Sequence, residues 1–335
     1  MDLAAERTLV TGAGGFIGSH LTEALLAMGC PVRCLVSYRA RGDRGWLDPC
    51  VSGAPGLEVL AGDVRDPQIA AEAVAGCSVV FHLAALVGIP FSYRSPASYV
   101  ETNVRGTLNL LQAARAAGVR RFVHTSTSEV YGQALVVPTA EDAPPRAQSP
   151  YAATKSAADQ LALSFHHSFG LPVSVIRPFN TYGPRQSARA VVPAIVSQIA
   201  AGCRTIRLGA LDPARDFTFV DDTVRGFIAV AGAEDAVGEV VNVGAGHEVT
   251  VAGICAVIQE VMGVSLPVEV DPARIRPSGS EILRLVADNR KAAALTGWRP
   301  RFQGPAGLRD GVRRTVAWFR QPQPAAQSGP PVYAV

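Results

Sequence analysis

The sequence is poor in the features that mark membrane, secreted and nucleic-acid-binding proteins. In its 335 residues, no stretch approaches the ~20 consecutive apolar residues of a membrane span. The 31 Lys and Arg residues nearly balance the 28 Asp and Glu residues, and they form no basic block. The first seven residues include two acids and lack the basic-then-apolar order of a secretory signal. We therefore expect a cytoplasmic protein with no membrane and no nucleic-acid partner.

Cysteine is scarce and shows no pairing pattern. The six cysteines form no CxxC pair and no Cys/His ligand spacing, which argues against a disulfide framework and against a zinc site. We expect buried free thiols and no metal. Hydrophobic residues make up 48% and charged residues 18%, a globular composition that suits one large or two modest domains. The cysteines are Cys30, Cys34, Cys50, Cys77, Cys203 and Cys255.

The first half of the chain alternates short β-branched runs with helical patterns. This alternation predicts βαβ units and an α/β fold of the Rossmann type, with a doubly wound parallel sheet. Two long helices are expected at residues 98–117 and 150–169, and each ends before a glycine. The expected strands are residues 8–10, 32–36, 57–60, 79–83, 121–125 and 173–177.

A glycine-rich segment, TGAGGFIG at residues 11–18, directly follows the first strand and opens a helix. That placement favours a dinucleotide-binding turn over a purely structural glycine turn. Its glycines permit a tight turn, close approach of backbone N–H groups to a pyrophosphate, and close packing of helix on strand. We expect cofactor contacts from Gly12, Gly15, Phe16, Ile17 and Gly18.

The residues after the second and third strands bear on the choice of cofactor. The second strand ends without the acid that binds the ribose 2′-hydroxyl of NAD, and offers Ser37 and Arg39 instead. Arg39 or Arg41 could meet the 2′-phosphate of NADP or be a solvated loop charge, so these residues leave NAD and NADP open. Asp63, followed by Val64, could accept a hydrogen bond from the adenine amino group or be a turn aspartate.

The regular alternation of strand and helix patterns is lost after about residue 180. We predict a dinucleotide-binding Rossmann domain over residues 1–180 and a smaller C-terminal α/β substrate lobe over residues 181–320. Residues 216–220 and 240–243 could return to the main sheet. Residues 321–335 are rich in proline and glutamine without periodicity, which predicts a disordered tail.

Tyr151 and Lys155 stand four residues apart at the start of the second long helix, for which Ser149 is the expected N-cap and Pro150 the first residue. They therefore share one helix face. An ammonium beside a phenol favours the phenolate, and a positively charged nicotinamide would add to this effect, so the tyrosine pKa is expected to fall from ~10 towards the working pH. Such a pair can take the proton of a hydroxyl while hydride leaves for a cofactor.

The fifth strand ends in the run HTSTSEVYG at residues 124–132, where ligands of open α/β sheets bind. Thr127, Ser128 and Glu129 are the catalytic candidates in this run, because hydroxyls can bond a sugar and a carboxylate can take a proton. The alternative is a Ser/Thr run that satisfies backbone groups, beside a solvated glutamate.

Candidate substrate contacts come from later segments. The loop at residues 177–185 follows the sixth strand and offers Asn180 and Arg185 to a sugar diphosphate, although a purely structural loop is an alternative. Arg215 and Arg276 could clamp phosphates, or could be surface charges.

Together these motifs resemble the extended short-chain dehydrogenase/reductases that modify nucleotide sugars, from residue 7 to residue 319. The chain is most similar to the NAD-dependent 4,6-dehydratases that act on UDP-N-acetylglucosamine, of the legionaminic-acid pathway type. The family resemblance rests on residues 11–18, 82–85, 126–132, 151–155 and 177–180, and the narrower one on residues 45–48, 188–193 and 208–210.

The resemblance implies a role for each matching residue. Tyr151 would be the base at the sugar C4 hydroxyl, with Lys155 as its electrostatic partner and a ribose contact. Thr127 would bond the C4 oxygen, and Glu129 would remove the C5 proton. Ser128 stands where dTDP-glucose dehydratases carry the aspartate that protonates the departing C6 hydroxyl, so Glu129 could serve both steps. Further implied contacts are Leu83, Ala84 and Ala85 with NAD, Asn180 with the diphosphate or sugar, and Arg215 and Arg276 with the nucleotide.

The implied reaction on a UDP-sugar is redox-neutral and yields a 4-keto-6-deoxy product. A UDP-glucuronate decarboxylase would share the first oxidation and can also carry Thr-Ser-Glu, whereas a 4-epimerase needs no carboxylate at Glu129. A non-catalytic dinucleotide-sensing protein is the alternative from another class, and the complete set of Tyr151, Lys155 and Thr127 argues against it. The resemblance also implies a homodimer formed by the two long helices.

Overall fold

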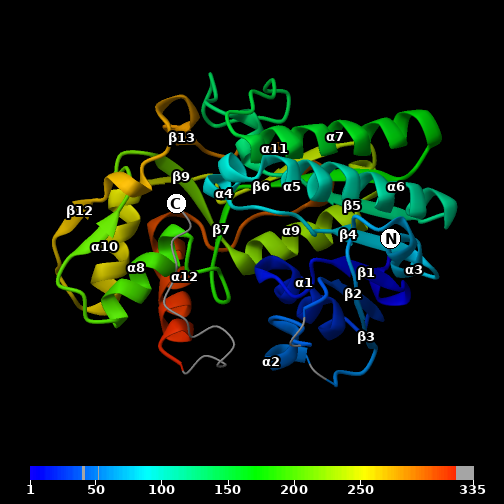
Figure 1. Cartoon of the computed structure of the whole chain (residues 1–335), viewed down its shortest axis with the longest axis horizontal. Coiled ribbons are helices and arrows are strands. Elements are labelled where there is room, and N and C mark those ends of the chain that lie inside the picture. Colours follow the sequence, from blue (N-terminus) through cyan, green and yellow to red (C-terminus); the bar gives the residue numbers. More distant parts are fainter. Residues whose placement is uncertain (40–41, 52, 322–335) are drawn as a thin grey trace.

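A seven-stranded parallel sheet forms the centre of the larger lobe (Figure 1). The computed structural model describes residues 1–39, 42–51 and 53–321. All six predicted strands are confirmed to within one residue at either end, because each is a buried run with β-branched residues. In order across the sheet, the strands are β10 (Val240–Val243), β6 (Val173–Pro178), β5 (Arg121–Thr125), β4 (Val79–His82), β1 (Thr8–Thr11), β2 (Val32–Val36) and β3 (Leu57–Ala61).

Helices cover both faces of the sheet, as the doubly wound prediction requires (Figure 1). Side chains alternate along each strand: Leu9 and Phe122 face one layer of helices, while Val10 and Val123 face the other. The first layer holds α3 (Pro67–Val74), α6 (Gly106–Ala116) and α7 (Pro150–Phe169), and the second holds α1 (Phe16–Ala27) and α9 (Val220–Gly232).

The helix predicted at residues 98–117 is not one continuous α-helix. After α5 (Pro96–Tyr99), residues Val100–Arg105 form a π-helical turn, and α6 then continues. Asn103 in this turn is buried, and its side chain accepts a hydrogen bond from the backbone N of Leu86 and donates to the Leu86 carbonyl and to Thr154 Oγ1. The π-helical turn therefore ties the loop after β4 to α7.

The smaller lobe consists of short sheets and three helices. β9 pairs with β7, β11 and β13, while β8 pairs with β12. Its elements are β7 (Asn180–Tyr182), α8 (Val191–Ala200), β8 (Ile206–Leu208), β9 (Ala214–Phe219), β11 (Glu248–Thr250), α10 (Val251–Met262), β12 (Val268–Val270), β13 (Arg284–Leu285) and α12 (Gly304–Phe319). Connecting segments hold α2 (Leu47–Val51), α4 (Ile89–Arg94), α11 (Arg290–Thr296) and the 3-10 turns Leu3–Ala5, Ser128–Tyr131, Glu234–Ala236, Pro272–Arg274 and Ser278–Ser280.

The chain crosses between the lobes after residue 180. Of the two segments that could return to the main sheet, residues 240–243 do so as β10, whereas residues 216–219 belong to β9 in the smaller lobe. α9 follows β9 directly and packs on β5 and β6, so the later part of the chain also supplies a helix to the larger lobe. The division at residue 180 remains a prediction, and the predicted tail lies outside the described residues beyond Gln321.

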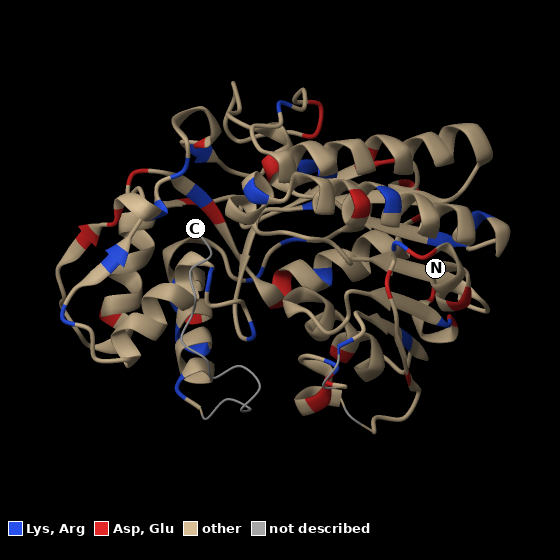
Figure 2. Ribbon diagram, in the orientation of Figure 1, with Lys and Arg blue, Asp and Glu red and all other residues tan. Residues whose placement is uncertain are grey.

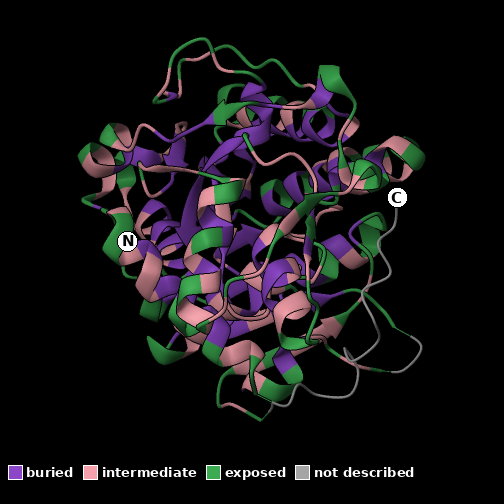
Figure 3. Ribbon diagram, turned by 90° about the vertical axis from the view of Figure 1, so that its left-hand side faces the viewer, coloured by how far each residue is buried: buried purple, intermediate pink, exposed green. Residues whose placement is uncertain are grey.

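Acidic and basic residues are interspersed over both lobes (Figure 2), and the strands of the main sheet are buried (Figure 3). Among the described residues, no helix has both the length and the apolar character that crossing a membrane requires. Within the same ranges, no three His, Cys, Asp or Glu side chains group as metal ligands would. Four cysteines are buried free thiols as predicted, but Cys203 is exposed and Cys50 is half-buried.

Candidate active site

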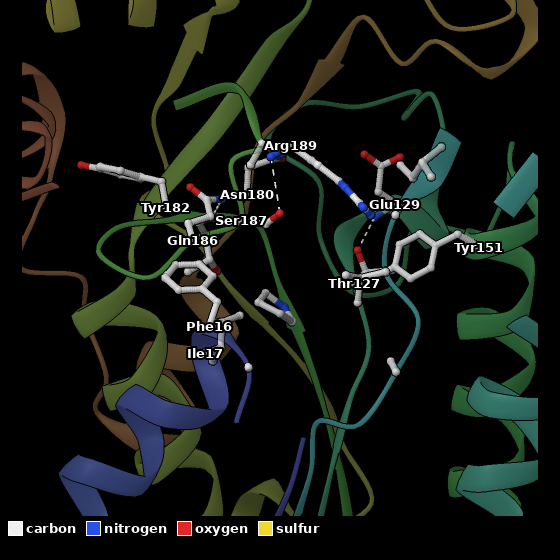
Figure 4. A pocket seen from close by; sticks show the side chains of 18 of the residues that line it. Phe16, Ile17, Thr127, Glu129, Tyr151, Asn180, Tyr182, Gln186, Ser187 and Arg189 are labelled. Atoms are coloured by element: carbon white, nitrogen blue, oxygen red, sulfur yellow. Dashed lines mark hydrogen bonds between the residues drawn. The ribbon is translucent and has the colours of Figure 1, made fainter. Parts of the chain in front are cut away.

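A cavity of about 810 Å³ lies between the two lobes, at the carboxyl ends of β1, β4, β5 and β6 (Figure 4). This is the edge where open α/β sheets bind their ligands. Four predicted site residues, Asp63, Val64, Ser128 and Arg185, are not part of its lining. The predicted residues that do line it are Gly12, Gly15, Phe16, Ile17, Gly18, Ser37, Arg39, Leu83, Ala84, Ala85, Thr127, Glu129, Tyr151, Lys155, Asn180, Arg215 and Arg276.

The glycine turn fits a dinucleotide. Gly12 adopts a φ of 68°, and a Cβ there would lie 2.9 Å from the backbone N of Ala84. A Cβ on Gly18 would lie 2.3 Å from the Gly12 carbonyl, so the helix packs directly on the turn. The N-cap of α1 is Gly15, and no side chain caps the helix there. The first helical residues line the cavity, so their free N–H groups are available to an anion.

At the predicted adenosine end of the site, Asp63 is ion-paired with a neighbouring residue. Its carboxylate is bound by the Arg65 guanidinium, with Oδ2 2.5 Å from Nη2, and these hydrogen bonds hold the Asp63 pKa below its ordinary value. Val64 is buried beneath α6, where Asn109 donates to its carbonyl. Both residues lie outside the cavity lining, and their contact with the adenine stays a prediction. Arg39 lines the cavity while its Nη1 lies 2.5 Å from Asp43 Oδ1, and Arg41 lies outside the described residues.

Tyr151 and Lys155 lie one turn apart on α7 and face the cavity, as predicted. The helix begins as predicted too, since Ser149 Oγ accepts a hydrogen bond from the backbone N of Ala152 at 3.1 Å. Burial lowers the pKa of Lys155 to about 8. The expected lowering of the Tyr151 pKa is wrong for this structure, because burial, aided by the nearby Glu129 carboxylate, raises the pKa more strongly than the Thr127 hydroxyl lowers it.

Thr127, Ser128 and Glu129 lie at the end of β5 and differ in what they face. Thr127 caps the 3-10 turn, since its Oγ1 accepts from the backbone N of Glu129 at 3.3 Å. Figure 4 shows Thr127, Glu129 and Tyr151 together on one side of the cavity, opposite Phe16 and Ile17. The Ser128 side chain is buried and not part of the lining, and its catalytic role stays a prediction.

The arginines predicted for the substrate divide into two groups. Arg276 lies with Nη1 3.7 Å from Glu129 Oε1, and the buried Arg215 lies with Nη2 3.1 Å from Glu281 Oε1. Both line the cavity, and burial lowers the pKa of Arg215. Arg185 turns away from it towards α1, where its Nη1 lies 2.6 Å from a carboxylate oxygen of Glu23. Arg185 is therefore held by α1 in this structure, and its contact with the substrate stays a prediction.

Arg189 is a cavity residue that the sequence motifs did not predict, and its side chain reaches across the cavity towards Glu129 and Thr127 (Figure 4). It lies in residues 188–193, which carried only the narrower resemblance, so that segment was the available signal.

A second missed feature is the buried carboxylate of Asp159, four residues beyond Lys155 on the same helix face. Its Oδ2 accepts from Ser126 Oγ at 2.7 Å and from Arg177 Nη2 at 3.0 Å. Burial acts to raise the Asp159 pKa, but His124, Arg177 and Ser126 outweigh it and the net shift is downward. The carboxylate is therefore a buried negative charge beneath Lys155.

Known proteins are similar to this chain over nearly its whole length. A family model described as GDP-mannose 4,6 dehydratase matches residues 9–311. A dTDP-glucose 4,6-dehydratase from Streptomyces antibioticus is 35% identical, with 96% of this chain and 98% of the relative covered. A UDP-glucose 4-epimerase from Mycolicibacterium smegmatis is 36% identical, with coverage of 94% and 98%.

Solved structures of such proteins are also similar to nearly the whole chain. DesIV, a dTDP-glucose 4,6-dehydratase from Streptomyces venezuelae crystallised with NAD and TYD, superposes with a TM-score of 0.85 at 35% identity, with 94% of this chain and 97% of that chain covered. The relatives thus include both dehydratases and an epimerase.

Proposed function

This chain belongs to the GDP-mannose 4,6-dehydratase family, and from that premise we propose that it is a nucleotide-sugar 4,6-dehydratase acting on UDP-N-acetylglucosamine. One observation carries the proposal: Tyr151, Lys155, Thr127 and Glu129 line a single cavity, across from the glycine turn. The choice of the UDP-sugar rests on the resemblance at residues 45–48, 188–193 and 208–210.

NAD is the cofactor that the site fits. The glycine turn accepts a pyrophosphate at the start of α1, and a similar dehydratase was crystallised with NAD. Arg39 is paired with Asp43, which favours NAD over a cofactor with a 2′-phosphate. When bound, NAD accepts hydride from the sugar and returns it.

The first step is oxidation at C4. Tyr151 takes the proton of the C4 hydroxyl, and Thr127 bonds the C4 oxygen. Lys155, whose pKa burial lowers to about 8, is mainly charged at neutral pH and stabilises the phenolate that Tyr151 needs. The C4 ketone then acidifies the C5–H bond.

The second step is loss of water across C5 and C6. The Glu129 carboxylate removes the C5 proton, and the resulting acid donates a proton to the departing C6 hydroxyl, so that water leaves and a C5–C6 double bond forms. Because the Ser128 side chain lies outside the cavity lining, Glu129 is assigned both proton transfers. Return of hydride to C6, together with return to C5 of the proton that Tyr151 took from the C4 hydroxyl, completes the 4-keto-6-deoxy sugar and restores both residues.

Two other reactions share the first step. A 4-epimerase, like the mycobacterial relative, needs no carboxylate beside the hexose, and Glu129 argues against it. A UDP-glucuronate decarboxylase is the second candidate, because the Arg189 side chain points towards Glu129, where a cation would attract a C6 carboxylate (Figure 4). A non-catalytic dinucleotide sensor would not need the complete Tyr151, Lys155 and Thr127 set.

The test is to incubate the purified NAD-loaded protein with UDP-, GDP- and dTDP-sugars, including UDP-N-acetylglucosamine and UDP-glucuronate, and to identify the products by NMR. The proposal expects a new C6 methyl signal from UDP-N-acetylglucosamine with no net NADH. Loss of CO₂ from UDP-glucuronate without any methyl product would establish the decarboxylase instead. Turnover of no sugar would support the sensor.

A further inference from the structure

The two lobes meet on one flank of the glycine turn through Arg185. Its Nη1 lies 2.6 Å from Glu23 Oε2 and donates to Ser19 Oγ at 3.2 Å, both on α1. His20, also on α1, contacts the Pro184 carbonyl through Nε2 at 3.1 Å. The loop after β7 is therefore fastened to the helix whose first turn faces the pyrophosphate site.

The backbone of Arg185 is held in an uncommon conformation for this contact. With a φ of 68°, it is the one non-glycine residue at positive φ in the described part of the chain. Such a conformation persists where the surroundings hold it, and here the side chain is 11% exposed against its carboxylate partner. Burial, followed by the charge of Arg185, lowers the pKa of His20 to about 4, so the ring beside the arginine is neutral at pH 7.

The second contact between the lobes also lies beside the glycine turn. The ring of Trp46 packs edge-on against Trp318 of α12, with centroids 5.1 Å apart. The backbone N of Trp46 donates to the Gly14 carbonyl at 3.0 Å, and a Cβ on Gly14 would lie 2.5 Å from the Arg44 carbonyl. The loop before α2 thus sits on the glycine turn, and its tryptophan reaches the smaller lobe.

Both fastened loops also line the cavity. Arg44 contributes from the loop before α2, Gln186 from the loop after β7, and Gly15 lies at the turn between them. A dinucleotide held at the start of α1 is thereby flanked by two contacts that join the lobes.

We propose that the Arg185–Glu23 ion pair and the Trp46–Trp318 contact form a latch that retains NAD between turnovers. Release of NAD from the turn requires the lobes to separate, and separation breaks both contacts. Retention suits an enzyme that takes a hydride from one sugar and returns it to the same sugar. The latch depends on the NAD cofactor of the proposed function and not on which nucleotide sugar is converted. A failure of the latch would therefore not count against the proposed reaction, and a different sugar substrate would not count against the latch.

The test measures how fast NAD leaves the holoenzyme. NAD-loaded protein is freed of unbound cofactor, and released NAD is trapped by an excess of alcohol dehydrogenase with ethanol, whose NADH absorbance reports the release rate. We expect Arg185→Gly, which removes the guanidinium and tolerates positive φ, to speed release about tenfold, and Trp318→Ala to speed it several-fold.

Matched variants separate the latch from general loosening of the fold. Arg185→Lys and Trp318→Phe keep the charge and the ring and are expected to restore most of the retention. Arg309→Ala breaks an ion pair with Glu260 that lies wholly within the smaller lobe and is expected to leave the release rate unchanged.

The melting temperature of each NAD-free variant is measured alongside the release rate. Unchanged release in a folded Arg185→Gly, Trp318→Ala double variant would overturn the latch. Should Arg185→Gly fail to fold, Glu23→Gln tests the same ion pair from its other side, and release at the wild-type rate from that variant would count equally against it.

Discussion

Replacement of Glu129 by Gln separates the two chemical steps of the proposed reaction. Glutamine keeps the size of the side chain and the backbone hydrogen bond to Thr127, but cannot take the C5 proton. Arg276 loses the charged partner that lies 3.7 Å from its buried Nη1, so we expect the fold to lose about 1–3 kcal/mol. Oxidation at C4 should survive, because the Glu129 charge acts to raise the pKa of Tyr151 and its removal favours the phenolate.

The expected magnitude follows from the lost proton transfer. A positioned general base contributes about 10²–10⁴-fold, which corresponds to about 3–5 kcal/mol of barrier at ~1.4 kcal/mol per tenfold. Elimination then becomes much slower than oxidation, so the reduced cofactor should accumulate on the enzyme.

Stopped-flow absorbance of the reduced nicotinamide, with NMR of the C6 methyl product, follows both steps in one sample. Glu281→Gln is the matched control, because Glu281 lines the same cavity but is paired with Arg215, and this variant should still make product. Product formation at the wild-type rate in Glu129→Gln would refute the assignment of Glu129 as the C5 base.

Three further predictions follow from the same site. Tyr151→Phe should slow the initial cofactor reduction by about 10²-fold or more, and normal reduction would contradict its role as the base. The rate of C4 oxidation should fall above about pH 8, where Lys155, whose pKa is lowered by burial, loses its charge. Because Asp159 acts to raise the Lys155 pKa, Asp159→Asn should move this loss of rate to lower pH. An unshifted pH–rate profile in Asp159→Asn would count against this coupling. Light scattering should give twice the chain mass of 35.1 kDa if α6 and α7 pair in a homodimer, whereas a monomer at micromolar concentration would contradict it.

The main sheet and the Tyr151–Lys155 pair could be predicted because their signals are local. A buried strand is a short β-branched run, and a shared helix face follows from a spacing of four residues. The glycine turn was recognisable for the same reason, since a strand and a helix adjoin it in the sequence.

Sequence reasoning could not predict contacts with partners that lie far away in the chain, or places where the backbone departs from a regular helical period. Arg185 is bound by Glu23, more than 160 positions away, and an arginine in a loop gives no indication of such a partner. The π-helical turn at Val100–Arg105 keeps the apolar spacing of an α-helix and so cannot be read from periodicity. The Tyr151 pKa is raised and not lowered, because burial outweighs the neighbouring groups that favour the phenolate. The spacing of Tyr151 and Lys155 gives no information on burial.

The position of Ser128 leads to a stereochemical consequence of the proposed dehydration. Three carboxylates line the cavity among the described residues: Asp43 is bound to Arg39, Glu281 is bound to Arg215, and Glu129 alone lies beside Tyr151. If Glu129 both removes the C5 proton and protonates the C6 hydroxyl, the two groups must leave from the same face of the sugar. We therefore expect syn elimination, measurable with a substrate that carries deuterium stereospecifically at C6 and tritium at C4. The geometry of the double bond and the face of hydride return then together set the configuration of the resulting CHDT methyl group. An anti outcome would require a second acid on the opposite face and would end the single-carboxylate mechanism.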